Sequence, residues 1–174
     1  PSGFENLGSA LIDLNRIPGR RYEELCQAGQ DLAACEPILN RTKVVSEVAV
    51  VLDYNSLWAN RIKPIHKEFT YEGYAQQLVG QLAALGVNVD LIGADHPLDG
   101  YRLVLVPFAP ILPEDFRRKC RDYAEKGGHL LAMTMAFSRD EWGSGIFEKS
   151  PVGMTDFFGM HVAEMEPVFD GQTD

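Results

Sequence analysis

The chain has 174 residues and a mass of 19.3 kDa, with 45% hydrophobic and 24% charged side chains. This composition is typical of one globular domain and excludes disordered, collagen-like and disulfide-scaffold proteins. Its 25 acidic and 16 basic residues give a net charge of −9, so neither nucleic acids nor anionic membranes are expected as partners. The basic stretches at residues 20–21 and 117–119 are expected on solvated helix faces.

The apolar runs and the cysteines indicate a location and a redox state. No apolar run reaches the roughly 20 residues that cross a bilayer. The chain also opens without a signal segment, so the cytoplasm is the expected location. Cys26 and Cys35 are expected on opposite faces of one helix, about 13 Å apart and beyond the reach of a disulfide. Together with Cys120 they are expected to be buried thiols.

A helix and a strand are the first predicted elements. Between residues 20 and 39, apolar or small residues recur at three- and four-residue spacing, which predicts an amphipathic helix. Residues 47–52 form a continuous, β-branched apolar run, typical of a strand that is covered on both faces of a parallel sheet. Residues 53–69 are mixed in character and long for a simple connection, so they are expected to form a functional loop.

A second helix and two further strands follow. A helical stripe of apolar residues runs from Tyr71 to Leu85 and stops at Gly86. Residues 87–92 begin with alternating apolar and polar residues, which predicts a strand nearer the sheet edge, and residues 102–106 are a third strand. We therefore expect the strand at residues 47–52 to lie between these two, with parallel pairing.

The last third of the chain predicts one more helix and one more strand. Residues 113–115, Pro-Glu-Asp, have the chemistry of a helix start, and the two glycines at residues 127–128 predict its end. Residues 129–134 are a fourth apolar strand. Beyond them, residues 155–159 predict a helical turn and residues 160–165 a short strand.

Strands that alternate with helices of about 10–15 residues predict an α/β fold with a small, doubly wound, mainly parallel sheet. Ligands of such folds bind beyond the carboxyl ends of the strands. In this chain that edge consists of residues 53–55, 93–96, 107–108 and 135–137.

The motifs of the common cofactor sites are missing. No glycine lies between Asp53 and Asn60, which excludes the glycine-rich turn of a dinucleotide site. The same stretch offers Tyr54, Leu57 and Trp58 where a flavodoxin-like phosphate loop uses glycine and small hydroxyl residues. The four histidines match no zinc-binding spacing, and no cysteine or serine lies in a nucleophile elbow. No cofactor, metal ion or catalytic nucleophile is therefore expected.

Carboxylates and tryptophans near the ligand edge are candidates for a sugar site or an interface. Asp53, Glu141 and Trp142 could meet there, with the two carboxylates acting on a glycosidic bond. The alternative is that Asp53 ends a strand while Asp140 and Glu141 cap a loop. Trp58 and Trp142 lie in the two longest predicted loops and could form an exposed aromatic patch, although a small core beneath the loops explains them equally well.

Several stretches together resemble one family. The segment VAVVLDYNSLWA at residues 48–59 resembles the DY-x-S-x-W-A stretch that opens the trimerisation domain of glycoside hydrolase family 42 β-galactosidases. The segment PGRRYEE at residues 18–24 resembles the connection that leads out of that family's catalytic barrel. Further similar pieces follow in the family's order at residues 86–90, 98–104, 123–128 and 140–141. The ordered set is more specific than any one piece.

The resemblance implies that residues 41–174 form a flavodoxin-like or class I glutamine amidotransferase-like domain that holds the full enzyme as a homotrimer. Residues 1–40 would be the linker and helix that lead from a catalytic barrel. The family's two catalytic glutamates belong to that barrel, to which nothing here corresponds, so no catalytic residue is carried over. The parent enzyme is expected to hydrolyse terminal β-D-galactosides, whereas this chain alone is expected to be inactive and to stop before the family domain's final strands.

Two hypotheses of different classes follow. The first is an oligomerisation domain of a β-galactosidase, and the second is a free-standing small-molecule-binding or hydrolytic α/β protein that uses Asp53 and Glu141. In a cyclic trimer a loop of one subunit can reach the barrel of its neighbour. Trp58, Asn60 and Trp142 are therefore the candidates for lining either the interface or the neighbour's sugar site, because aromatic faces stack on pyranoses and amides bond their hydroxyls.

Overall fold

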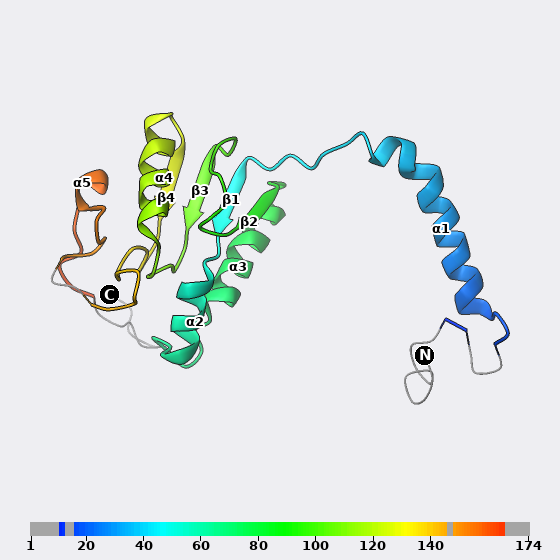
Figure 1. Ribbon diagram of the computed structural model, residues 1–174, viewed down its shortest axis with the longest axis horizontal. Helices are drawn as coiled ribbons and strands as arrows, with labels where there is room; N and C mark the ends of the chain where they lie inside the picture. Colours follow the sequence, from blue (N-terminus) through cyan, green and yellow to red (C-terminus); the bar gives the residue numbers. More distant parts are fainter. Residues whose placement is uncertain (1–10, 13–15, 146–147, 166–174) are drawn as a thin grey trace. The chain divides into compact units, whose positions relative to one another are not determined.

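A computed structural model describes residues 11–12, 16–145 and 148–165 of the protein (Figure 1). The chain divides into two compact units, residues 1–44 and 45–174. The described part of the first contains a long helix, and the second contains a sheet with its covering helices. Within the described ranges, no helix is both long and apolar enough to cross a membrane.

Helix α1, Arg20–Leu39, is the main element of the first unit and confirms the predicted helix. It begins after Gly19, and an ion pair of 2.5 Å joins Arg20 to Glu24 in its first turns. No residue of α1 is buried. The prediction that Cys26 and Cys35 are buried is therefore wrong, and both thiols are exposed. An apolar stripe shows only that a helix face is suited to packing against another surface. In this structure no surface buries any residue of α1.

A four-stranded parallel sheet organises the second unit. In sheet order its strands are β2 (Val89–Ile92), β1 (Val48–Val51), β3 (Leu103–Val106) and β4 (His129–Ala132). Val48 pairs with Val89 on one side and with Leu103 on the other. The central place of β1 and the edge place of β2 confirm the predicted arrangement. Every residue of β1 is buried, which explains its uninterrupted apolar sequence.

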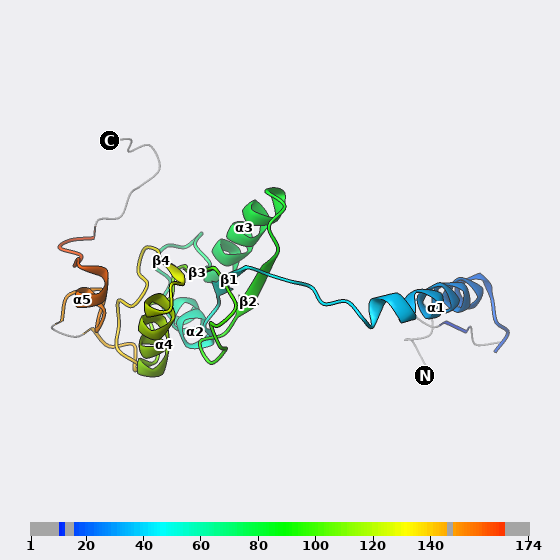
Figure 2. The ribbon, with the colours of Figure 1, turned by 90° about the horizontal axis from the view of Figure 1, so that it is seen from above.

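Helices cover both faces of the sheet, so the doubly wound α/β fold is confirmed (Figure 2). The helices of this unit are α2 (Tyr54–Ile62), α3 (Tyr71–Ala84), α4 (Glu114–Glu125) and α5 (Thr155–Phe158). Val50 of β1 shares a core cluster with Ala75 of α3, whereas its neighbour Val51 shares the other cluster with Phe116 of α4. The alternation of side chains along β1 thus directs successive residues into two separate helix layers.

The predicted helix ends have the expected chemistry. The Thr70 hydroxyl accepts the N–H of Gly73 at 3.1 Å and starts α3, and Pro113 precedes the first turn of α4. The chain leaves these two helices through Gly86 and Gly127, whose φ angles of +76° and +91° favour glycine.

Three expectations for this unit are wrong. Residues 53–69 are not one loop, since α2 occupies much of them. The inward face of α2 is largely polar, so its buried residues lack the apolar spacing that predicts a helix. Residues 160–165 form no strand. Arg117, expected on a solvated face, is only 4% exposed because its guanidinium donates to backbone carbonyl groups.

Candidate interaction surface at the carboxyl edge of the sheet

Helix α2 begins where β1 ends because Asp53 caps it. The Asp53 carboxylate accepts the N–H of Ser56 at 2.8 Å. Burial raises the pKa of this carboxyl, an effect that outweighs the opposing hydrogen bonds from Ser56 and the backbone of Asn55. Asp53 therefore serves helix initiation, in line with the interpretation that it ends a strand.

Helix α2 buries the polar Ser56 and Asn60 beside the apolar Leu57 and directs its aromatic side chains outward. Ser56 and Asn60 are buried, whereas Tyr54 is 63% and Trp58 is 54% exposed, with their ring centroids 5.9 Å apart. The Ser56 hydroxyl donates to the carbonyl of Ile111 at 2.8 Å and accepts its N–H at 3.0 Å. The Oδ1 of Asn60 is buried, and no group in the described part of the chain bonds it. Polar contacts thus fasten α2 to the loop after β3.

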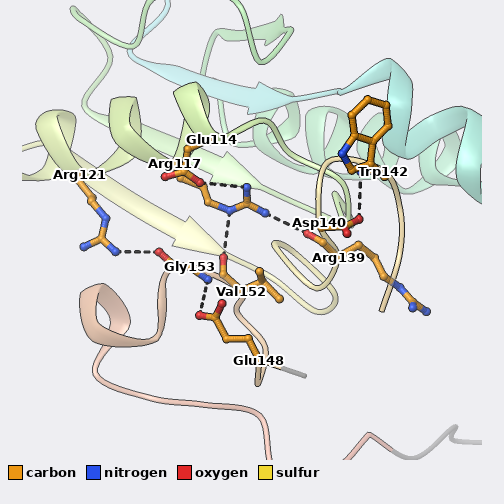
Figure 3. A network of polar contacts seen from close by, with 9 residues as sticks. All are labelled: Glu114, Arg117, Arg121, Arg139, Asp140, Trp142, Glu148, Val152 and Gly153. Atoms are coloured by element: carbon orange, nitrogen blue, oxygen red, sulfur yellow. Dashed lines mark hydrogen bonds and ion pairs between the residues drawn. The ribbon is translucent and has the colours of Figure 1, made fainter. Parts of the chain in front are cut away.

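Trp142 lies in a turn that Asp140 organises. One oxygen of the Asp140 carboxylate accepts the N–H of Trp142 at 3.0 Å and that of Ser144 at 2.7 Å. The Trp142 side chain is 83% exposed and points away from the polar contacts beneath it (Figure 3). Glu141, in the same turn, is also exposed. Because Asp53 is buried, the two carboxylates of the hydrolase hypothesis do not share an environment.

The two tryptophan-bearing segments both contact Ile111. Helix α2 reaches it through Ser56, as described above. The Trp142 turn reaches it through Gly143, where an added Cβ would lie 2.9 Å from the Ile111 Cδ1. The N–H of Arg139 also donates to the carbonyl of Pro110 at 3.0 Å. The structure therefore brings both segments to the same edge of the sheet, as the sequence predicts.

Two arginines of α4 hold the base of the Trp142 turn and the segment after it (Figure 3). The Nε of Arg117 donates to the carbonyl of Val152 and its Nη2 to that of Arg139, both at 3.0 Å. One helical turn later, Arg121 donates to the carbonyl of Gly153 at 2.8 Å. These bonds join residues far apart in the sequence, and the buried Arg117 supports the base of the turn that carries the exposed Trp142.

Sequence reasoning identified Trp58 and Trp142 but missed two features of this surface. Tyr54 and Ile62 lie four residues before and after Trp58, and both are exposed. That spacing was visible in the sequence and would have shown three apolar residues on one helix face. The buried Arg117 had no comparable signal, because acids lie near it in the sequence as they do on a solvated helix.

A small cavity among the described residues lies away from the two tryptophans. A cavity of about 220 Å³ opens at the opposite edge of the sheet, and its lining includes residues 99–102 and 126–129. Ligand pockets are usually larger, at roughly 300–1,000 Å³. Within residues 11–12, 16–145 and 148–165, no group of three or more histidine, cysteine, aspartate or glutamate side chains could hold a metal ion.

The fold and this surface define a doubly wound α/β domain that presents exposed aromatic side chains at the carboxyl edge of its sheet. The family model of the beta-galactosidase trimerisation domain matches residues 46–174. The chain belongs to this family, which confirms the resemblance seen in the sequence and favours the oligomerisation hypothesis over the free-standing protein.

Curated relatives extend the similarity through the first unit. The chain is 28% identical over 168 residues to the beta-galactosidase BgaH of Haloferax lucentense, covering 97% of this chain and 24% of the relative. It is 25% identical over 172 residues to the beta-galactosidase LacZ of Lactobacillus acidophilus, covering 98% of this chain and 26% of the relative. The chain thus spans about a quarter of the length of these relatives.

Solved structures give the same result. The beta-galactosidase of Halorubrum lacusprofundi is 27% identical with a TM-score of 0.74, over 86% of this chain and 22% of that one. The enzyme of Rahnella sp. R3 is 25% identical with a TM-score of 0.79, over 94% of this chain and 24% of that one. The structure of a domain within larger β-galactosidases is therefore similar to this fold.

Proposed function

We propose that this chain holds a larger β-galactosidase together as a homotrimer, and that the whole enzyme hydrolyses terminal β-D-galactosides in the cytoplasm. The observation that carries the proposal is the trimerisation-domain match over residues 46–174, in a chain that spans about a quarter of its relatives. The catalytic carboxylates then belong to another part of the polypeptide, and this chain contributes assembly.

In this proposal residues 1–40 are the linker and helix that lead from the catalytic barrel, and residues 41–174 are the trimerisation domain. The exposed apolar side chains of α1 support this division. Tyr22, Leu25 and Leu32 recur at helical spacing, and none is buried. Such a stripe is stabilised when another surface covers it, and the rest of the enzyme would supply that surface.

We further propose that Trp58, Asn60 and Trp142 line the contact between subunits or the sugar site of a neighbouring subunit. The exposure of both tryptophans supports a role outside their own chain. Asn60 differs from the tryptophans because it is buried, and its place in this proposal rests on its Oδ1, which accepts no hydrogen bond within the described part of the chain.

Assays of two lengths of polypeptide test the assembly role. The 174-residue chain is expected to leave a chromogenic β-galactoside unchanged, whereas the whole polypeptide is expected to hydrolyse it and to sediment as a trimer. Turnover by the short chain that is lost in Asp53→Asn or Glu141→Gln would refute the proposal, and so would an active monomer of the whole polypeptide.

Trimer content and kinetics, measured together, separate the two roles of the aromatic residues. If Trp58→Ala or Trp142→Ala lowers trimer content and activity in parallel, the side chain packs at the interface. If the trimer persists and KM for the galactoside rises, the side chain lines the sugar site. An intact trimer with unchanged kinetics would exclude both roles for that residue.

A further inference from the structure

The outer face of α2 carries an apolar stripe. Tyr54, Trp58 and Ile62, here called the α2 stripe, follow one another at four-residue spacing and therefore lie on one side of the helix. Their exposed fractions are 63%, 54% and 85%. Ile65, just beyond the helix, is exposed as well. The stripe is therefore a run of large apolar side chains in contact with solvent.

The helix does not need this stripe to pack on its own domain. The helix is held instead by the Asp53 cap, by the two bonds between Ser56 and Ile111, and by Leu57, which is buried in the main core cluster. A helix on the surface of a globular protein ordinarily keeps its large apolar residues on the inner face, as α2 does with Leu57, so three more on its outer face are unusual. Exposed apolar clusters of this kind mark contacts with other molecules.

Charge indicates what covers the stripe. Residues 54–67 contain no acidic side chain, although the chain has 25 acidic residues and a net charge of −9. The same stretch contains Arg61, Lys63 and Lys67. Arg61 pairs with Glu72, and Lys67 lies 3.9 Å from Glu68. Of the three basic side chains, Lys63 therefore remains without an ion pair among the described residues. The stretch around the stripe thus carries no acidic side chain and one base, Lys63, that the described residues leave without an ion pair, on a chain of net charge −9.

We propose that the α2 stripe docks on an acidic surface of a second copy of this chain. The inference rests on the proposed trimerisation and adds which face makes the contact. A basic, apolar face that meets a different, acidic face is a heterologous contact, and contacts of this type close rings such as trimers. The aromatic pair supplies the buried anchors and Lys63 supplies electrostatic complementarity.

Charge placed on the stripe tests the contact in the whole polypeptide. The double variant Trp58→Asp, Ile62→Glu is expected to raise the dissociation constant between subunits by at least about thirtyfold in sedimentation velocity, because it removes an aromatic anchor. Leu85→Glu, which alters an exposed apolar residue at the end of α3, is the matched control and is expected to leave the trimer intact. Circular dichroism checks that both variants fold.

Photo-crosslinking shows what the stripe touches. With p-benzoylphenylalanine placed at Ile62, irradiation is expected to give covalent dimers between copies, whereas the same group at Leu85 is not. A double variant that remains trimeric, or crosslinks that form only within one copy, would overturn the proposed contact and leave the trimerisation proposal standing. A wild-type polypeptide that is monomeric would instead refute trimerisation itself.

Discussion

The hydroxyl of Tyr71 accepts the backbone N–H of Asp53 at 3.2 Å, at the point where β1 turns into α2. The same hydroxyl donates to the carbonyl of Val51 at 2.8 Å. Burial raises the pKa of the Tyr71 phenol, so it stays neutral and keeps the proton that this bond needs. One side chain of α3 therefore satisfies two backbone groups at the end of the central strand.

Removing that hydroxyl should destabilise the domain. Tyr71→Phe leaves a buried N–H and a buried carbonyl without their partner, and we expect a loss of about 1–3 kcal/mol in the free energy of unfolding. Urea unfolding measures it. Tyr54→Phe removes a hydroxyl from an exposed tyrosine and should change stability by less than about 0.5 kcal/mol. Equal effects of the two changes would contradict the assigned role of Tyr71.

The cap residue should make stability fall as pH rises. The folded-state pKa of Asp53 is raised above its ordinary value of 3.8, so the native state binds more protons than the unfolded state in the range just above that value. The contribution of Asp53 is then fully present below the unfolded pKa and is lost as pH rises through the folded pKa. Relative to Asp53→Asn, the wild type should lose stability across this window in urea unfolding at a series of pH values.

Asp156 provides a control of opposite sign. Its hydrogen bonds and ion pair with Arg121 lower the pKa of the Asp156 carboxyl. Relative to Asp156→Asn, the wild type should therefore gain stability as pH rises through the acid range. If the stability difference between wild type and variant changed with pH in the same direction at both positions, burial would not be the dominant influence on the pKa of Asp53.

Much of the fold was predictable because its signals are local. The buried β1 has a continuous apolar sequence, and turn glycines follow α3 and α4, so strand order and helix ends could be predicted. Helix α2 could not, because buried apolar periodicity is the usual helix signal and Leu57 is the one apolar side chain among its three buried residues. The strand expected at residues 160–165 does not form, because a stretch of chain becomes a strand only when a neighbouring strand pairs with it.

The surface was only partly predictable. Trp58 and Trp142 drew attention because large aromatic side chains in predicted loops are unusual. The contacts of their two segments with Ile111, made through Ser56 and Gly143, depend on three distant segments meeting, and nothing local in the sequence encodes them. The burial of Arg117 likewise depends on the carbonyls of Val152 and Arg139, which lie 35 and 22 residues away.

Arg117 and its neighbour Arg118 offer a paired test of that burial. Arg117→Ala leaves two carbonyl groups unpaired and opens a void, so we expect a loss of about 3 kcal/mol or more in the free energy of unfolding. Arg118→Ala removes an exposed ion pair with Asp115 and should cost less than about 1 kcal/mol. Thermal or urea unfolding distinguishes the two. Similar costs would contradict the structural role of Arg117.

A glycine pair tests the packing at the start of β4. An added Cβ at Gly128 would lie 2.3 Å from the ring of Tyr123, whose hydroxyl donates to the carbonyls of Tyr101 and His129. Gly128→Ala should therefore destabilise the domain by about 2 kcal/mol or more. Gly80→Ala, in the middle of α3 with nothing within 4 Å, should stabilise it by about 0.5–1 kcal/mol. Differential scanning calorimetry measures both signs.

The thiols should divide into two classes in the 174-residue chain. Burial raises the pKa of Cys120 to about 12, so this thiol should resist an aromatic disulfide reagent at pH 8 until the protein unfolds. Cys26 and Cys35 are exposed on α1 and should react at once. The expected yield is two thiols under native conditions and three in urea. Fast reaction of all three would contradict the burial of Cys120.

The central place of β1 has a consequence for synthesis. Both strands that pair with it, β2 and β3, come later in the chain, and β3 ends about 55 residues after β1 does. A ribosome adds about 5–20 residues per second. For several seconds the nascent β1 therefore has both of its edges open and its apolar side chains uncovered, which makes it a segment that chaperones would engage before the rest of the sheet is made.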